Sequence, residues 1–269
     1  VKKFGFAKDT AVVAWSGDNP CSLIGTGGWS TETAVVSLGT SDTYFAAMSR
    51  PHVDPYGSGH VFGNPAGGYM GLVCFKNGSL AREHVKDLHG LTWDEFDRMI
   101  TQETQAGNNG NMMLPFFVPE ITPAVLNPEP VSEGSEEFVN SKDPAADVRA
   151  VVEAQCLNMR QHTSWLQEQP SSLRITGGGS RSLGFCRVLA DVFNADVERP
   201  DIENSAALGA AMRACHSCAG EDWDMLTEKF CKLSGDNSII QPIAGNVDIY
   251  QQRLGPAFEE FLQRTLRSC

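Results

Sequence analysis

Three short loops carry the residues of this chain that are best suited to chemistry. They are residues 16–20 (SGDNP), 37–42 (SLGTSD) and 176–182 (TGGGSRS), and each is predicted to lie at the end of a strand. Glycine lets backbone N–H groups approach an oxyanion because no Cβ intervenes, and hydroxyl groups add further donors. A carboxylate can accept the proton of a substrate hydroxyl. Loops of this kind that face one cleft would suit phosphoryl chemistry.

The second loop is a candidate phosphate cradle. Gly39 allows close approach of the backbone, and the hydroxyl groups of Thr40 and Ser41 add hydrogen-bond donors. The alternative is a tight hairpin turn, because β-branched runs at residues 33–38 and 43–48 flank the loop.

The third loop is a stronger candidate for a nucleotide site. Gly177, Gly178 and Gly179 lie between a predicted strand and a predicted helix, where free N–H groups and the positive end of the helix dipole favour phosphate. A dinucleotide-binding fold is the alternative, because Glu198 lies about 20 residues further on, near the usual position of a ribose-binding acid. Ser182 replaces the last glycine of that fingerprint, and this fold would leave the other two loops unexplained.

Asp18 in the first loop is the candidate general base. It follows a predicted strand at residues 10–16 and is flanked by Gly17. A carboxylate there can take the proton of a hydroxyl that attacks a phosphoryl group. The alternative is that Asp18 caps the helix that follows.

The elements that must position these loops follow an α/β pattern. Apolar runs predict strands at residues 10–16, 33–38, 43–48, 69–75 and 173–176, and a short one around Val197. Helical spacing predicts helices at residues 93–104 after a capping Thr92, from 147 to before Pro170, around 185–193 and at 204–218. Residues 107–111 are a predicted loop, and residues 115–143, which show little periodicity, are predicted to form a surface loop or short excursions. Hairpins followed by alternating strands and helices predict an α/β domain with a mixed sheet.

Composition excludes several classes of function. The 33 acidic and 21 basic residues give a net charge of −12 with no basic stripe, so nucleic acid and membrane surfaces are not expected partners. No run is apolar enough to span a membrane, and no signal peptide is apparent, which favours a cytoplasmic location. The chain begins with Val1 and soon enters an apolar run, which predicts a fragment of a longer protein.

The eight cysteines are scattered, which is typical of reduced thiols rather than of a disulfide framework. Cys215 and Cys218 are the only close pair, and zinc or redox chemistry there is the alternative to structural thiols. The six histidines are dispersed. The sequence contains no GxxxxGK[ST], HExxH or GxSxG motif, so it lacks the local signatures of P-loop, zincin and serine-hydrolase chemistry.

In this order the three loops resemble the C-terminal domain of the FGGY carbohydrate kinases, within the actin, hexokinase and Hsp70 superfamily. Among these the sequence is most similar to the D-xylulose kinases of eukaryotes. The resemblance extends over nearly the whole chain and is carried by the three loops and by GHVF at 59–62 with Asn64-Pro65, LVCFKNGSLARE at 72–83, EITP at 120–123, LADVF at 189–193 and NSAALGAAMRA at 204–214.

The resemblance implies a ribonuclease H-like mixed sheet flanked by helices, and ATP with Mg²⁺ as cofactors. Asp18 falls on the family's catalytic aspartate, which deprotonates the acceptor hydroxyl. Gly39, Thr40 and Ser41 fall on the loop that contacts the nucleotide phosphates. Gly177, Gly178 and Gly179 fall on the adenosine motif, and Ser182 stands where some relatives have an asparagine near the adenine. No metal ligand is expected in this chain.

The resemblance also implies a second domain. Residues 1–269 correspond to the C-terminal nucleotide-binding domain, and the N-terminal domain, which carries a DxGT motif and most sugar contacts, is the expected partner outside this chain. The expected activity of the full-length protein is phosphorylation of a ketopentose, D-xylulose, to D-xylulose 5-phosphate, with no turnover by this half alone. The alternatives are a kinase for ribulose or glycerol and a silent nucleotide-binding module, and the sequence leaves a homodimer open.

Overall fold

A mixed β-sheet forms the centre of the molecule. The computed structural model describes residues 3–14, 16–140, 143–166, 169–233 and 235–268. Within these residues, seven strands pair in the order β3-β4-β2-β1-β7-β8-β9. Their bounds are β1 (Thr33–Leu38), β2 (Asp42–Met48), β3 (His60–Gly63), β4 (Tyr69–Phe75), β7 (Ser172–Thr176), β8 (Asp196–Glu198) and β9 (Ile239–Ile240). The strands β1, β7 and β8 are parallel and the other pairs are antiparallel, so the predicted mixed sheet is confirmed.

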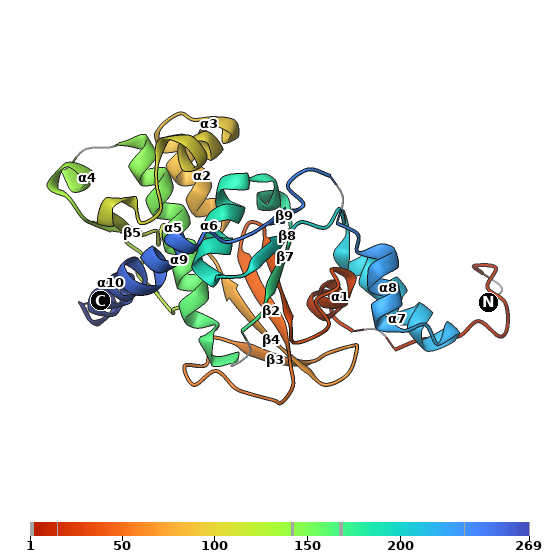
Figure 1. Cartoon of the computed structure of the whole chain (residues 1–269). Helices are drawn as coiled ribbons and strands as arrows, with labels where there is room; N and C mark the ends of the chain where they lie inside the picture. Colours follow the sequence, from red (N-terminus) through yellow and green to blue (C-terminus); the bar gives the residue numbers. More distant parts are fainter. Residues whose placement is uncertain (1–2, 15, 141–142, 167–168, 234, 269) are drawn as a thin grey trace.

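Helices cover both faces of this sheet (Figure 1). Helices α5 and α6 lie on one side, and α1 and α7 lie on the other. The α-helices are α1 (Asp18–Gly25), α2 (Ser79–Leu88), α3 (Trp93–Arg98), α4 (Glu136–Asn140), α5 (Pro144–His162), α6 (Leu183–Phe193), α7 (Ser205–Ala219), α8 (Trp223–Phe230), α9 (Ala244–Ile249) and α10 (Gly255–Ser268). Two π-helical turns, Met99–Glu103 and Tyr250–Leu254, follow α3 and α9, and a small hairpin pairs β5 (Met112–Leu114) with β6 (Val131–Glu133).

The side chains of β1 alternate between two cores. Val36 and Leu38 belong to the larger apolar cluster, which also contains residues of α5 and α6. Val35 belongs to a second cluster, where it joins Leu23 of α1 and Phe45 of β2. Because successive side chains of a strand point to opposite faces, one apolar strand can anchor helices on both sides of the sheet.

Within the described residues, none of the helices has the length and apolar character that a membrane span requires.

Most predicted elements are confirmed with small shifts at their ends. The strand at residues 33–38 has the bounds of β1, and the strands at 43–48, 69–75 and 173–176 correspond to β2, β4 and β7. Thr92 forms a capping box with Glu95 at the start of α3. The helix after Asp147 begins earlier than predicted, because Asp143 caps it by accepting a hydrogen bond from the Ala145 N–H at 3.0 Å.

The predicted strand at residues 10–16 is wrong for the residues that the structure describes. Residues 10–14 and 16 form no strand, and Trp15 lies outside the described residues. The run has the composition of a strand, but a strand must bond to a neighbour, and no described strand pairs with this run. Val12 is 96% exposed, so this segment belongs to no core cluster of the described chain.

Helix α1, which begins with Asp18, is held by a close crossing with α7. A Cβ on Gly25 would lie 1.9 Å from the carbonyl oxygen of Ser205, and a Cβ on Gly209 would lie 1.8 Å from that of Cys21. The two helices therefore need glycine on both sides of the contact. This contact explains the small residues of α7, which the alanine-rich sequence predicted as a site of close approach.

Candidate functional site

Two of the three predicted loops leave the sheet side by side. Strands β1 and β7 are parallel neighbours, with Ser37 opposite Thr176. The loops that follow them therefore start side by side, at the carboxyl ends of the two strands. Gly177 lies against the end of β1, because an added Cβ would be 2.5 Å from the carbonyl oxygen of Leu38. Its backbone angles, φ +87° and ψ 175°, lie in a region that is essentially restricted to glycine. Glycine at this position therefore allows the two loops to touch.

A cavity of about 600 Å³ lies against these loops. Of the predicted site residues, the structure brings five together in its wall: Gly39, Thr40, Gly178, Gly179 and Ser182. The other walls come from helices α2, α3 and α6, which contribute Arg82, Glu83, Trp93, Asp94, Asp97 and Phe185. Ser41 and Gly177 are part of the same loops but do not line the cavity.

The hairpin turn after β1 is fixed from behind by Gly78 and Ser79. The N–H of Ser79 donates to the carbonyl oxygen of Gly39 at 3.0 Å. A Cβ on Gly78 would lie 2.5 Å from the backbone nitrogen of Asp42 and 2.8 Å from the carbonyl carbon of Ser41. The loop is thus the hairpin turn of the alternative interpretation and, at the same time, one wall of a cavity.

A buried ion pair lies below this turn. Arg82 donates to both carboxylate oxygens of Asp42, at 2.6 and 3.0 Å, and to Gln155 at 2.8 Å. Burial raises the pKa of Asp42, and the charge and hydrogen bonds of Arg82 oppose that rise. The Arg82 guanidinium also lies 4.8 Å from the centre of the Phe185 ring. These contacts join the hairpin, α2, α5 and α6 around one end of the cavity.

The side chains of Ser182 and Asp97 meet at another part of the wall. The hydroxyl of Ser182 accepts a hydrogen bond from the Phe185 N–H at 3.0 Å and donates to Asp97 Oδ1 at 2.5 Å. The Gly184 N–H donates to the same oxygen at 2.8 Å. Trp93 of the same helix also lines the cavity, and its ring lies 5.5 Å from the Phe96 ring in an edge contact. Ser182 therefore both caps α6 and fixes the orientation of an acid on α3.

Asp18 lies apart from this cavity. It is the first residue of α1, its side chain is exposed, and its Oδ1 accepts the N–H of Asn19 at 2.9 Å. The capping alternative is not what the structure shows, because Gly17 occupies the N-cap position. Among the described residues, no side chain or backbone group besides Asn19 bonds to the Asp18 carboxylate, so it is accessible to a ligand.

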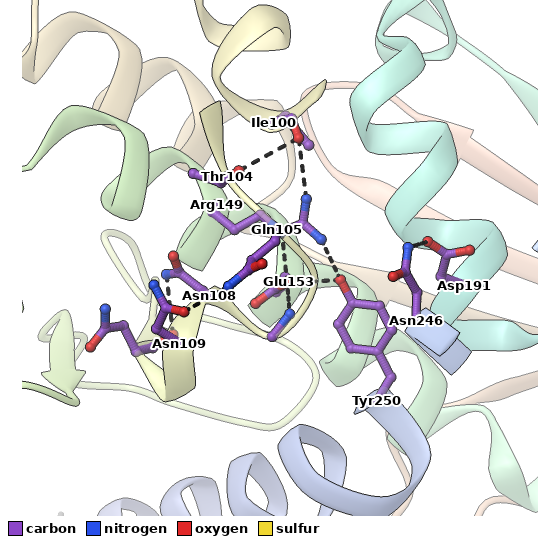
Figure 2. Close-up of polar contacts among 12 residues, drawn as sticks. Ile100, Thr104, Gln105, Asn108, Asn109, Arg149, Glu153, Asp191, Asn246 and Tyr250 are labelled. Carbon is purple, nitrogen blue, oxygen red and sulfur yellow. Dashed lines mark hydrogen bonds and ion pairs between the residues drawn. The ribbon is translucent and has the colours of Figure 1, made fainter. Parts of the chain in front are cut away.

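A buried polar network joins α5 to the segments that follow α3 and α9 (Figure 2). Glu153 Oε1 accepts from Arg149 Nε at 2.7 Å, from the Tyr250 hydroxyl at 2.7 Å and from the Gly107 N–H at 2.8 Å. Arg149 also donates to Tyr250 at 2.6 Å and to the carbonyl oxygen of Ile100 at 3.3 Å. Burial raises the pKa of Glu153 and of Tyr250, and Arg149 opposes both shifts. The network ties both π-helical turns to α5.

Tyr250→Phe tests the contribution of this network to stability. The variant keeps the ring and both ions but removes the hydroxyl that lies between them, so a buried donor and a buried acceptor lose a partner. We expect the free energy of unfolding to fall by about 1–3 kcal/mol, measured by urea denaturation. Tyr69→Phe is the matched control, because Tyr69 is 42% exposed. Equal stability of Tyr250→Phe and the unmodified chain would contradict a structural role of the hydroxyl.

The dinucleotide-binding alternative is wrong. The residue that it needs, Glu198, forms an ion pair with Arg174, whose Nε lies 2.7 Å from Glu198 Oε2. The same guanidinium donates to the carbonyl oxygen of Thr26 at 2.7 Å, so the pair holds β7, β8 and the end of α1 together. An antiparallel hairpin next to β7 also departs from the parallel order of a dinucleotide fold.

The cysteine pair considered for zinc chemistry contains free thiols. Neither Cys215 nor Cys218 takes part in a disulfide in the described chain, and Cys218 is exposed while Cys215 is half-buried. His216, between them, stacks on Trp223 with ring centroids 4.4 Å apart. Among the described residues no group of three or more His, Cys, Asp or Glu side chains is arranged to hold a metal ion.

Sequence reasoning missed Arg82, Trp93 and Asp97 as residues of the cavity. The contacts that bring Arg82 and Asp97 to the site span 40 and 85 residues of sequence, so no local motif reveals them. The one local signal was the capping box at Thr92, which fixes the start of α3 and with it the positions of Trp93 and Asp97.

The mixed sheet, the two glycine loops and the cavity beside them define an α/β domain with a cavity at the ends of two central, parallel strands. The family model described as "FGGY family of carbohydrate kinases, C-terminal domain" matches residues 34–218. The chain belongs to this family.

Relatives agree with this assignment over most of the chain. The xylulose kinase of Rattus norvegicus is 37% identical over 272 residues, which cover 99% of this chain and 50% of that protein. Xylulose kinase 2 of Arabidopsis thaliana is 37% identical over 235 residues, which cover 80% of this chain and 41% of that protein. The chain thus spans about half the length of the curated relatives that it matches.

Solved structures share the fold. The structure of a ligand-bound xylulose kinase from Lactobacillus acidophilus matches with a TM-score of 0.85 at 21% identity, covering 98% of this chain and 53% of that one. The Plasmodium falciparum glycerol kinase with ADP matches with a TM-score of 0.75 at 15% identity, covering 91% and 50%. At these identities the likeness concerns the fold alone, and it confirms the actin and hexokinase type of fold that the resemblance implies.

Proposed function

We propose that residues 1–269 form the nucleotide-binding C-terminal domain of an ATP-dependent sugar kinase. The observation that carries the proposal is the pair of glycine loops, after β1 and β7, that line one cavity of about 600 Å³. This volume lies within the range of about 300–1,000 Å³ that is common for small-molecule sites. Gly178 leaves open space for a ligand at the cavity wall, because nothing lies within 4 Å of the position that a Cβ would take.

In this proposal the two loops divide the nucleotide between them. The backbone and hydroxyl groups of Gly39, Thr40 and Ser41 would contact the phosphates. The loop at 177–179 would contact the adenosine part, with Ser182 close to the base. Because Asp97 and the Phe185 N–H already engage the Ser182 hydroxyl, we propose that the base contacts of this chain differ from those of relatives with asparagine at that position.

Mg²⁺ would enter with the nucleotide. Because the described residues offer no group of three or more His, Cys, Asp or Glu side chains for a metal, the phosphates would supply most of its ligands. Asp42 is not available to it, since both of its oxygens accept hydrogen bonds from Arg82. The bound ion would neutralise phosphate charge during transfer.

Asp18 would act as the general base toward the acceptor sugar. Its carboxylate is exposed at the start of α1, so it can face a substrate that is held by a second domain. We propose D-xylulose as the acceptor and D-xylulose 5-phosphate as the product, because the relatives that match most of this chain are xylulose kinases. Structures with this fold also include a gluconate kinase and a glycerol kinase, so the fold does not select the acceptor.

The N-terminal sugar-binding domain would be a separate part of the full-length protein. This chain alone should then bind nucleotide without phosphorylating sugar. The alternative of a silent nucleotide-binding module predicts the same binding by the chain but no turnover by the full-length protein. An assay of the full-length protein with D-xylulose, D-ribulose and glycerol separates these two proposals and identifies the acceptor.

Titration calorimetry of this chain with ATP, ADP and NAD, each with Mg²⁺, tests the nucleotide site. We expect saturable binding of ATP and ADP and weaker binding of NAD. Removal of Mg²⁺ with EDTA should weaken ATP binding, because the phosphate charge is then uncompensated. Absence of ATP binding at millimolar concentration would refute the proposed site.

A further inference from the structure

In the described chain, only one of the two carboxylate oxygens of Asp97 accepts hydrogen bonds. Its Oδ1 accepts two hydrogen bonds, from the Ser182 hydroxyl at 2.5 Å and from the Gly184 N–H at 2.8 Å. In the described part of the chain, no donor contacts Oδ2. Asp97 lines the cavity, so one oxygen of this acid is available to a ligand while the other fixes its orientation.

The position of Asp97 is set by contacts on both sides of its segment. It lies on α3, whose start is fixed by the capping box at Thr92. The π-helical turn that follows α3 packs on the start of α6, because a Cβ on Gly184 would lie 2.7 Å from the Cβ of Ile100. Arg149 holds the carbonyl oxygen of Ile100 from the other side. An acid fixed in this way can discriminate between ligands by geometry.

Asp97 lies toward the base and not toward the phosphates of the proposed nucleotide. The phosphate end is defined by Gly39 and Thr40 after β1. Asp97 instead bonds to Ser182, beyond the glycines of the second loop, and shares its helix with Trp93, which also lines the cavity. An indole ring is a suitable surface for a purine, because every base has a face that can stack.

We propose that Asp97 Oδ2 accepts a hydrogen bond from the exocyclic N6 amino group of adenine and thereby selects ATP over 6-oxopurine nucleotides. The proposal rests on the proposed nucleotide site. A carboxylate recognises guanine best when its two oxygens accept hydrogen bonds from N1–H and N2–H at the same time. Here Oδ1 already accepts two hydrogen bonds, which leaves one oxygen for one donor. At position 6 of the purine ring, adenine offers such a donor in its amino group. Inosine and guanine have the acceptor O6 at the same position, and this oxygen would face the negative charge of Asp97.

Asp97→Asn tests this selectivity, with ATP, ITP and GTP as probes in calorimetric titrations of the whole chain. The asparagine carbonyl is expected to keep the bonds from Ser182 and Gly184, so its NH₂ group takes the place of Oδ2 and donates toward the base. The unmodified chain should bind ATP about tenfold more tightly than ITP or GTP. In the variant ATP binding should weaken about tenfold and ITP binding should strengthen, because O6 gains a donor.

Other outcomes overturn the proposal in distinguishable ways. Equal binding of ATP and ITP by the unmodified chain refutes the role of Asp97 but leaves the nucleotide site intact. An equal loss for both nucleotides in the variant indicates a contact with ribose and also refutes it. If the unmodified chain binds no nucleoside triphosphate, the proposed function fails as well.

A control and a second variant complete the test. Asp248→Asn makes the same change of charge on the exposed surface of α9 and should leave the ATP to ITP ratio unchanged. Ser182→Ala keeps the Asp97 charge but removes the hydroxyl that orients it. It should lower the ratio partway toward one, and it serves if Asp97→Asn does not fold. An unchanged ratio in Ser182→Ala would contradict the orienting role of that hydroxyl.

Discussion

Asp18→Asn in the full-length protein should lower kcat for the phosphorylation of D-xylulose by about 10²–10⁴-fold, the usual contribution of a general base. Asparagine has nearly the shape of aspartate but cannot take the proton of the attacking hydroxyl. Asp18 is exposed and bonds only to the N–H of Asn19 in the described chain, so the fold should tolerate the change. A coupled assay of ADP formation measures kcat, and calorimetry measures ATP binding.

The effect should appear in kcat and not in nucleotide affinity, because Asp18 does not line the cavity beside the glycine loops. Asp224→Asn is the matched control, since Asp224 is an exposed acid in the first turn of α8. It changes net charge by the same amount and should leave kcat within twofold of the unmodified enzyme. Equal turnover by Asp18→Asn and Asp224→Asn would exclude Asp18 as the base.

Local patterns were sufficient to predict most of the sheet. The run at 33–38 has a β-branched pattern and a tight turn at its end, and its bounds agree with those of β1. Strand β3 was missed because it is short and mostly exposed, and only its pairing with β4 makes it a strand. No helix was predicted after residue 218, and the π-helical turn Tyr250–Leu254 interrupts the regular spacing between α9 and α10 there.

The predicted strand at 10–16 failed for a related reason. Its composition matches that of a strand, but strand formation depends on a partner that the run does not itself contain. The described residues provide none, and Val12 is almost fully exposed. Composition could therefore predict the tendency of this segment but not its pairing.

The candidate site was predictable only where its residues share a loop. The glycines at 39 and 177–179 are visible as turns after strands, and the parallel pairing of β1 with β7 brings them together. The ion pair of Arg82 with Asp42 and the contact of Ser182 with Asp97 join elements that are distant in sequence. Such pairs depend on tertiary packing, so hydrophobic periodicity carries no information about them.

Gly177→Ala should abolish the close contact between the loop after β1 and the loop after β7. The proposed phosphate-binding loop at residues 39–41 would then lose its neighbour. The backbone angles of Gly177 cost a residue with a side chain about 1–3 kcal/mol. The new Cβ would also lie 2.5 Å from a backbone oxygen of β1, which cannot move without disturbing the sheet. Overpacking of this kind adds about 1–3 kcal/mol. Together these terms predict a fall of roughly 2–6 kcal/mol in the free energy of unfolding.

Two further glycine variants separate the two causes of the lower free energy of unfolding, which are backbone strain and steric contact with β1. Gly178→Ala adds a Cβ that meets no atom within 4 Å, so stability should stay within about 0.5 kcal/mol. ATP affinity should still decrease, because Gly178 lines the cavity. Gly90→Ala has a positive φ of +62° but open space, and it measures backbone strain alone. Urea denaturation and ATP titration of the three variants should therefore show Gly177→Ala as the least stable. A Gly177→Ala variant no less stable than Gly90→Ala would mean that contact with β1 does not require glycine.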